Sequence, residues 1–267
     1  MKSQSETVGG PLTPTIPHRL GEGMSAAEWQ IRCDLAALYR ICDLYGWTDT
    51  IYTHLSARIP GEPDCFLINN YGDLFSEITA SGLVKVDIAG NVLSKGGAFN
   101  PAGFIIHGGV YKARLDVSCV MHTHTRPGTG ISVLKRGLRP ISQDVLEVYD
   151  ELAYHEYGSL AATAHEEGEA LGLTCQKGDS IILRNHGLLT VGATLQAALQ
   201  RMYYLNRACE VEVIARSLGE TPVPIESDVI NSYAEGVKRR RSLPDFGVPL
   251  WRAAIRQINC RGTDWRG

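Results

Sequence analysis

Two histidines separated by one residue form the part of this sequence with the clearest capacity for chemistry. His122 and His124 follow the short apolar run 117–121, which predicts a β-strand. Side chains two residues apart on a strand point to one face, about 6 to 7 Å apart along the chain, so both imidazoles can reach one ion. His186, after the apolar run 180–184, is the candidate third ligand. Three neutral imidazoles leave coordination positions open for water or substrate, as in a catalytic metal site.

The pair also has a simpler interpretation, in which both histidines are hydrogen-bonded residues of the core or of a loop. The chain contains eight histidines, and one His-x-His pair can arise by chance in such a chain. A further histidine, His107, is expected to pack or cap within its own helix. The metal hypothesis therefore depends on the sequence that surrounds the pair.

Capping residues and periodicity outline the elements that would position these histidines. Ser25 and Glu28 form a capping box before apolar residues at helical spacing. Asn100, followed by proline, opens a second helix, and a long amphipathic helix is expected over 194–218. Short strands are expected at 51–58, 65–69, 82–95 (as strand, turn and strand), 117–121 and 180–184. Strands and helices without strict alternation indicate an α/β layer domain, and no glycine-rich nucleotide-binding motif occurs.

Three regions are predicted along the 267 residues, enough for one substantial core. Residues 1–23, rich in Gly, Pro, Ser and Thr, are expected to be a flexible arm. Residues 24–220 would form the α/β domain. Residues 221–267 are expected to be a tail that packs on the body or on a neighbouring subunit. Its last 30 residues, with two prolines and two tryptophans, are expected to be irregular.

Composition excludes several function classes. The net charge of −3 disfavours nucleic acid as a partner, and the basic run 238–241 is interpreted as a solvated face or an oligomer contact. No run approaches 18 apolar residues, so no membrane span is expected, and the first residues lack the apolar segment of a secretory signal. The seven cysteines include no Cys-x-x-Cys pair and are expected to be reduced thiols. We expect a cytoplasmic protein.

The sequence around the histidines resembles a known family. The segments Val-Ser-Cys-Val-Met-His-Thr-His at 117–124 and Ile-Ile-Leu-Arg-Asn-His-Gly-Leu at 181–188 are similar to the class II aldolase/adducin head domain. The resemblance extends from about residue 25 to 217 and includes the segments 53–56, 79–82 and 100–116. It implies a three-layer α/β/α fold, with a central sheet that is mostly antiparallel, and a homotetramer. It also implies that His122, His124 and His186 hold a divalent metal, Zn²⁺ in the sugar-phosphate aldolases.

The departures from the family pattern concern its aldolase chemistry. Gly103 stands where the family aldolases carry a catalytic Glu, and Pro101 and Ala102 stand where they carry two phosphate-binding serines. The Asn of the first phosphate-binding loop is His54 here. A sugar-phosphate aldolase of the standard kind is therefore disfavoured, while the metal ligands are kept.

Other residues are candidates for the missing acid/base. Tyr154, Tyr157 and Glu147 lie in the segment where the family places groups on the substrate side, although each also suits surface or core packing. The leading hypothesis is an aldolase-type lyase, decarboxylase or isomerase acting through an enolate on a small unphosphorylated carbonyl or hydroxy acid. One alternative is a non-haem Fe²⁺ oxygenase acting on an aryl pyruvate-like acid. Another is a non-catalytic adducin-like interaction module.

Overall fold

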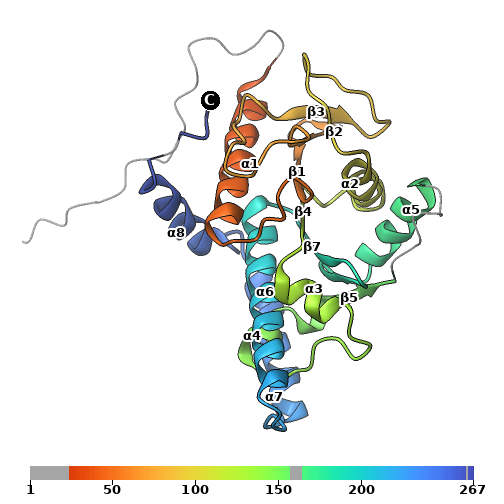
Figure 1. Cartoon of the computed structure of the whole chain (residues 1–267), viewed down its shortest axis with the longest axis vertical. Helices are drawn as coiled ribbons and strands as arrows, with labels where there is room; N and C mark the ends of the chain where they lie inside the picture. Colours follow the sequence, from red (N-terminus) through yellow and green to blue (C-terminus); the bar gives the residue numbers. More distant parts are fainter. Residues whose placement is uncertain (1–23, 157–163, 263) are drawn as a thin grey trace, which may run out of the picture.

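A seven-stranded sheet forms the middle layer of the protein (Figure 1). The computed structural model describes residues 24–156, 164–262 and 264–267. The strands are β1 (His54–Ile59), β2 (Glu62–Ile68), β3 (Val84–Asp87), β4 (Cys119–Thr123), β5 (Leu152–His155), β6 (Ser180–Leu183) and β7 (Gly187–Gly192). Their order is β3-β2-β1-β4-β7-β6-β5, and all neighbours are antiparallel except β5 and β6.

Helices cover both faces of this sheet. They are α1 (Ala26–Leu44), α2 (Pro101–Ala113), α3 (Arg126–Ser132), α4 (Gln143–Leu146), α5 (Ala164–Cys175), α6 (Leu195–Ser217), α7 (Ser227–Arg241) and α8 (Val248–Asn259), with a short 3₁₀ turn at Tyr149–Glu151. One core lies between the sheet and α1, α6 and α8, and a second lies between the sheet and α2 and α5. The predicted three-layer α/β/α fold with a mostly antiparallel sheet is confirmed.

Strand β1 lies between the two cores and is buried along its whole length. Successive side chains of a strand point to opposite faces, so Leu55, Ala57 and Ile59 enter the core beneath α1. His54, Ser56 and Arg58 point the other way, toward α2. A polar row of side chains is thereby held inside the protein, on the same face of the sheet as His122.

The predicted helix starts are confirmed by their caps. Ser25 accepts the Glu28 N–H, Asn100 accepts the Ala102 N–H, and Thr194 accepts the Ala197 N–H. The observed strands differ in detail from those expected from the sequence. β4 extends to Thr123 and so contains His122, and only a single bridge between Val86 and Val92 pairs β3 with the expected second strand of 82–95.

The prediction of an irregular C-terminal tail was wrong. α7 and α8 occupy most of residues 227–259, and α8 packs against α1 and α6. Trp251, Ala254, Ile255 and Ile258 recur at helical spacing and are buried, as is Trp265 near the C-terminus. This periodicity was readable in the sequence, but the nearby prolines obscured it; Pro249 instead occupies the first turn of α8, where the missing N–H costs nothing.

Within the described ranges, no helix is both long and apolar enough to cross a membrane. The N-terminal segment predicted to be a flexible arm, residues 1–23, lies outside the described residues.

Candidate metal centre

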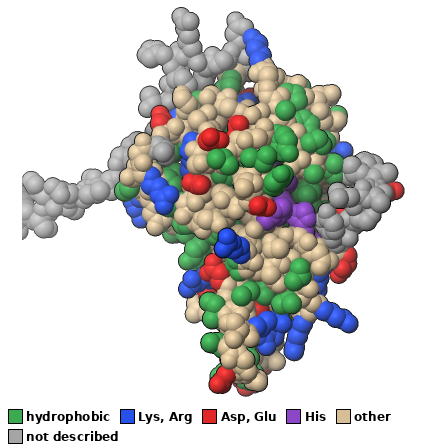
Figure 2. Space-filling view, viewed as in Figure 1, with side chains coloured by type: hydrophobic (Ala, Val, Ile, Leu, Met, Phe, Trp, Pro, Cys, Tyr) green, Lys and Arg blue, Asp and Glu red, His purple; other side chains and the backbone are tan. Residues whose placement is uncertain are grey.

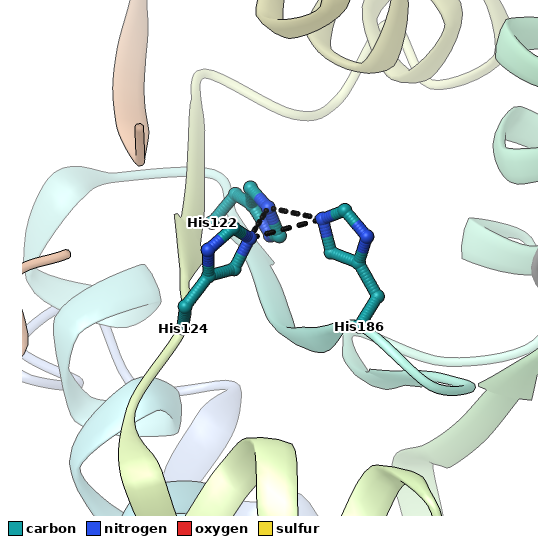
Figure 3. A group of neighbouring side chains, drawn as sticks. All are labelled: His122, His124 and His186. Carbon is teal, nitrogen blue, oxygen red and sulfur yellow. Dashed lines mark hydrogen bonds between the residues drawn. The ribbon is translucent and has the colours of Figure 1, made fainter. Parts of the chain in front are cut away.

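Three histidines converge where β4 ends and where the turn between β6 and β7 leads into β7 (Figure 3). The Nε2 atom of His124 lies 3.0 Å from the Nε2 atoms of both His122 and His186. The Nε2 atoms of His122 and His186 lie 3.1 Å apart. The structure thus brings together the three residues that the sequence singled out, although His186 is 62 residues from His124 in the chain.

The turn that carries His186 needs its two flanking residues. Asn185 has a φ of 57°, in the left-handed region that asparagine tolerates better than most residues. Gly187 lies so close to β4 that a Cβ there would be 2.5 Å from the Thr123 carbonyl oxygen. The Asn-His-Gly sequence therefore allows a tight turn that presses His186 against the end of β4.

Hydrogen bonds to the other ring nitrogens determine which nitrogen faces the centre. His122 donates from Nδ1 to the Leu188 carbonyl at 3.0 Å, and His124 donates from Nδ1 to the Asp49 carboxylate at 2.8 Å. In a neutral imidazole with its proton on Nδ1, Nε2 carries a lone pair. Such contacts are typical partners of metal-binding histidines, because they hold the ring and its tautomer.

Burial favours the neutral form of these rings. It lowers the pKa of His122 well below its ordinary value, with further lowering by His54 and the other triad histidines. It also lowers the pKa of His186, to about 4, with a smaller contribution from His124. Both rings are therefore neutral at pH 7, the form in which imidazole binds a metal.

The donor set fits a divalent ion. The nitrogen lone pairs of His122 and His124 face each other at 3.0 Å, an arrangement that a cation between them stabilises. Two ligands on a tetrahedral zinc with Zn–N distances of about 2.0–2.1 Å are separated by about 3.3 Å, close to the spacing of this triad. His122, His124 and His186 could therefore hold one divalent metal, with zinc as a suitable ion.

A chain of buried polar side chains lies beside the triad. His54 is paired with His122 across β1 and β4, and their ring centroids are 5.0 Å apart. The Nδ1 atom of His54 is 2.8 Å from Nε2 of His107, whose Nδ1 contacts the Ser56 hydroxyl. The Ser56 hydroxyl is 2.8 Å from the Tyr111 hydroxyl. His107 packs in the interior as expected, but the expectation that it does so within its own helix was wrong, because its ring nitrogens contact His54 and Ser56 of β1.

Tyr154 is not beside the histidines. It pairs with Ile182, which pairs with Leu188, which pairs with Thr123, so three strand spacings of about 4.8 Å separate it from β4. Its ring packs toward the core beneath α6, and its hydroxyl accepts the Leu138 N–H at 2.9 Å. A catalytic role for Tyr154 stays a prediction.

Glu147 also has other partners. Its carboxylate accepts hydrogen bonds from the Tyr233 hydroxyl and, at 2.7 Å, from the Arg240 guanidinium, both on α7. Tyr157 lies outside the described residues. The catalytic roles of Glu147 and Tyr157 therefore stay predictions as well.

Sequence reasoning missed Asp49 and the polar chain behind His54. The chain had a readable signal, because His54 and Ser56 alternate with Leu55 and Ala57, which is unusual for a strand buried on both faces. No sequence signal pointed to Asp49, since it lies in an irregular segment before β1 and contacts His124 only in the folded protein.

Comparison with known proteins identifies the family. The model of the Class II Aldolase and Adducin N-terminal domain matches residues 33–213. A Pseudomonas aeruginosa protein described as a class 2 aldolase is 42% identical over 255 residues, covering 94% of this chain and 98% of that protein. Alpha-adducin of Rattus norvegicus is 39% identical over 209 residues, which are 76% of this chain but only 28% of the adducin.

Solved structures of similar fold lead to the same family. An aldolase II superfamily protein from Pseudomonas syringae superposes with a TM-score of 0.85 at 42% identity, covering 92% of this chain and 98% of that one. L-fuculose 1-phosphate aldolase from Glaciozyma antarctica superposes with a TM-score of 0.79 at 27% identity, covering 91% and 96%. The chain belongs to the class II aldolase and adducin N-terminal domain family.

Proposed function

We propose that this protein is a metal-dependent enzyme of the lyase type, with His122, His124 and His186 as the ligands of one divalent ion. The observation that carries the proposal is the convergence of three Nε2 atoms within 3.1 Å of one another. A bound Zn²⁺ would polarise a carbonyl of the substrate and stabilise the enolate formed from it. C–C cleavage, decarboxylation and isomerisation can each proceed through such an enolate.

The substrate that we propose is a small carbonyl or hydroxy acid without a phosphate group. Pro101 and Ala102, at the start of α2, have no hydroxyl to offer to a phosphate. A side chain at position 103 has no room, because a Cβ there would lie 2.7 Å from Cδ2 of His54. Positions 101–103 therefore offer neither the two phosphate-binding hydroxyls nor the Glu of the family's sugar-phosphate aldolases.

A cavity next to the triad supports a small acidic substrate. It has a volume of about 460 Å³ and is bordered by His124, Trp47 and Arg126, and also by Glu210, whose carboxylate accepts a hydrogen bond from Asn206. A guanidinium can bind a carboxylate through two parallel hydrogen bonds, which suits a keto or hydroxy acid. The His124 side chain is 21% exposed and His186 is partly exposed, so the centre is accessible from solvent. Figure 2 shows histidine side chains at the surface of the molecule.

The experiment is a paired assay of the protein reconstituted with zinc and with iron. Phosphorylated sugars of the fuculose and ribulose type are compared with alkyl and aryl keto and hydroxy acids, in air and without oxygen. We expect turnover of an unphosphorylated acid that His186→Ala abolishes. Cleavage of sugar phosphates should be at least about 10² slower, since losing a general base costs about 10² to 10⁴ in rate. Cleavage of a sugar phosphate at an ordinary aldolase rate would overturn the proposal.

The same assay separates two alternatives. Turnover that requires iron and oxygen would favour an oxygenase acting on an aryl pyruvate-like acid. The similarity to alpha-adducin favours a second candidate, a non-catalytic interaction module. Protein that binds no metal and turns over none of these compounds would support that candidate.

We further propose that the protein is a homo-oligomer, most simply a tetramer. Apolar side chains are exposed near the C-terminal end of α6, among them Ile214, Leu218 and Val223, which are 58%, 71% and 83% exposed. A second subunit would bury such side chains from water. Light scattering should give a mass near four times 29.2 kDa; a mass of one chain at micromolar concentration would contradict this proposal.

A further inference from the structure

Four polar side chains form a continuous buried chain that ends beside the triad. In order they are Tyr111 and His107 of α2 with Ser56 and His54 of β1, linked as Tyr111–Ser56–His107–His54. The exposed fractions are 1%, 0%, 0% and 3% in that order. Buried polar groups are costly unless each hydrogen bond is made, so the direction of every hydrogen bond in this chain can be worked out.

The hydrogens can be counted from the Tyr111 end. His54 and His107 are 3% and 0% exposed, and an unpaired charge is costly in such a site, so each ring is neutral and carries one proton. Their facing nitrogens, 2.8 Å apart, share one of these protons. Among the described residues, Ser56 is the hydrogen-bond partner of the Tyr111 hydroxyl. Tyr111 must therefore donate to Ser56, since the opposite direction would leave its own hydrogen buried without an acceptor.

The remaining directions follow. Ser56, accepting from Tyr111, donates its hydrogen to Nδ1 of His107. His107 then carries its proton on Nε2 and donates it to Nδ1 of His54. The single proton of His54 must be on Nε2. The chain thus ends in an N–H donor on His54, on the side of the ring that is not bonded to His107.

That N–H lies on the triad side of the sheet. His54 and His122 are direct cross-strand partners, so their side chains share one face. Gly103 lies against the same edge of the ring, where a Cβ would be 2.9 Å from Nε2 of His54. The imidazole of His54 thus occupies the space that a side chain at position 103 would need.

We propose that His54 is a further catalytic residue, whose Nε2–H donates a hydrogen bond to the oxygen of the substrate on which negative charge develops. His107, Ser56 and Tyr111 are positioning residues that hold His54 in this tautomer. The inference rests on the proposed function for its substrate, but the tautomer does not depend on it. No proton needs to leave His54, because an N–H donor directed at a developing oxyanion lowers the barrier by itself.

The first experiment needs no substrate. Two-bond ¹⁵N–¹H spectra of the histidine side chains distinguish Nε2–H rings from Nδ1–H rings, with assignment by single-histidine variants. In zinc-loaded and in metal-free protein at pH 7, His54 and His107 should both be Nε2–H, whereas His122 and His124 should be Nδ1–H. A His54 ring with its proton on Nδ1, or with zinc on its Nε2, would overturn the proposal whatever the protein catalyses.

The second experiment uses variants of the chain. His54→Asn should keep its zinc, keep KM within a few-fold and lose about 10² to 10³ in kcat, as for removal of one oxyanion donor. Ser56→Ala should lower kcat about 10-fold and give mixed tautomers at His107, and Ser56→Thr should restore both. An unchanged kcat in His54→Asn, or loss of zinc from it, would contradict the role. If no substrate is turned over, the proposed function fails, but the tautomer spectra still test the hydrogen-bond directions from Tyr111 to His54.

Discussion

The His54 ring occupies the space that a side chain at position 103 would need: a Cβ on Gly103 would lie 2.7 Å from Cδ2 and 2.9 Å from Nε2 of that ring. The two positions belong to different elements, β1 and α2, and are 49 residues apart in the sequence. The relationship ties together two departures from the family's aldolases that the sequence presents as separate substitutions.

A double-mutant cycle tests this relationship. Gly103→Glu alone should lower the free energy of unfolding by at least about 1 to 3 kcal/mol, because it overpacks a buried site. Adding His54→Asn should recover more than about 0.5 kcal/mol of that loss, the coupling expected of residues in contact. Urea unfolding of the four proteins measures the coupling energy. Additive effects would mean that the ring and the new side chain do not meet.

The carboxylate of Asp49 should strengthen metal binding through His124. Asp49→Asn should weaken zinc affinity about 10- to 100-fold, as is typical when the partner of a metal-binding histidine is removed. His186→Ala should lose most of the metal. Competition with a chromogenic chelator gives the affinities, and Asp64→Asn, an exposed acid on β2, is the matched control. Equal zinc affinity in Asp49→Asn and Asp64→Asn would mean that Asp49 does not contribute to metal binding.

Gly187 should be needed for the turn that carries His186. Gly187→Ala places a Cβ 2.5 Å from the Thr123 carbonyl oxygen, so the turn must move. We expect a loss of about 1 to 3 kcal/mol in the free energy of unfolding and weaker zinc binding. Gly130→Ala in α3 is the control, because its Cβ would meet nothing closer than 3.9 Å. Calorimetry with and without zinc measures both effects, and normal zinc affinity in Gly187→Ala would contradict the prediction.

The metal-free protein should lose stability as the pH falls below 6.5. Burial lowers the pKa of His54, His107 and His122, and lowers that of His186 to about 4. Histidines of the unfolded chain take up protons near pH 6.5, while these rings in the folded protein do not. The unfolded state therefore binds more protons between about pH 6.5 and 4, and the free energy of unfolding falls with pH in that window.

Urea unfolding with a chelator, from pH 8 to 4.5, measures this dependence. Above pH 7 these four histidines should contribute no slope, because they are neutral in both states. His107→Gln should reduce the slope below pH 6.5 by up to about 1.4 kcal/mol per pH unit, the value for one proton. The same slope in both proteins would mean that His107 is protonated in the fold.

Much of this protein could be predicted from local sequence alone. The caps at Ser25, Asn100 and Thr194 placed three helices, because capping satisfies backbone N–H groups within a few residues of the side chain. The pair at His122 and His124 and the Asn-His-Gly turn, read with the family resemblance, indicated the candidate centre, because their geometry depends mainly on one strand end and one tight turn. The resemblance to the family supplied the layer order, which local patterns leave open.

Only the tertiary structure decided what surrounds the triad. Asp49 reaches His124, and His107 reaches His54, across elements that are far apart in the chain. Tyr154 lies three strand spacings from β4 because β7 and β6 insert between them, an order that neighbouring sequence does not encode. The exclusion of a side chain at position 103 by the His54 ring also depends on how closely α2 packs on β1. Contacts of this kind arise from the packing of whole layers, so the three candidate ligands could be found from the sequence while their hydrogen-bond partners could not.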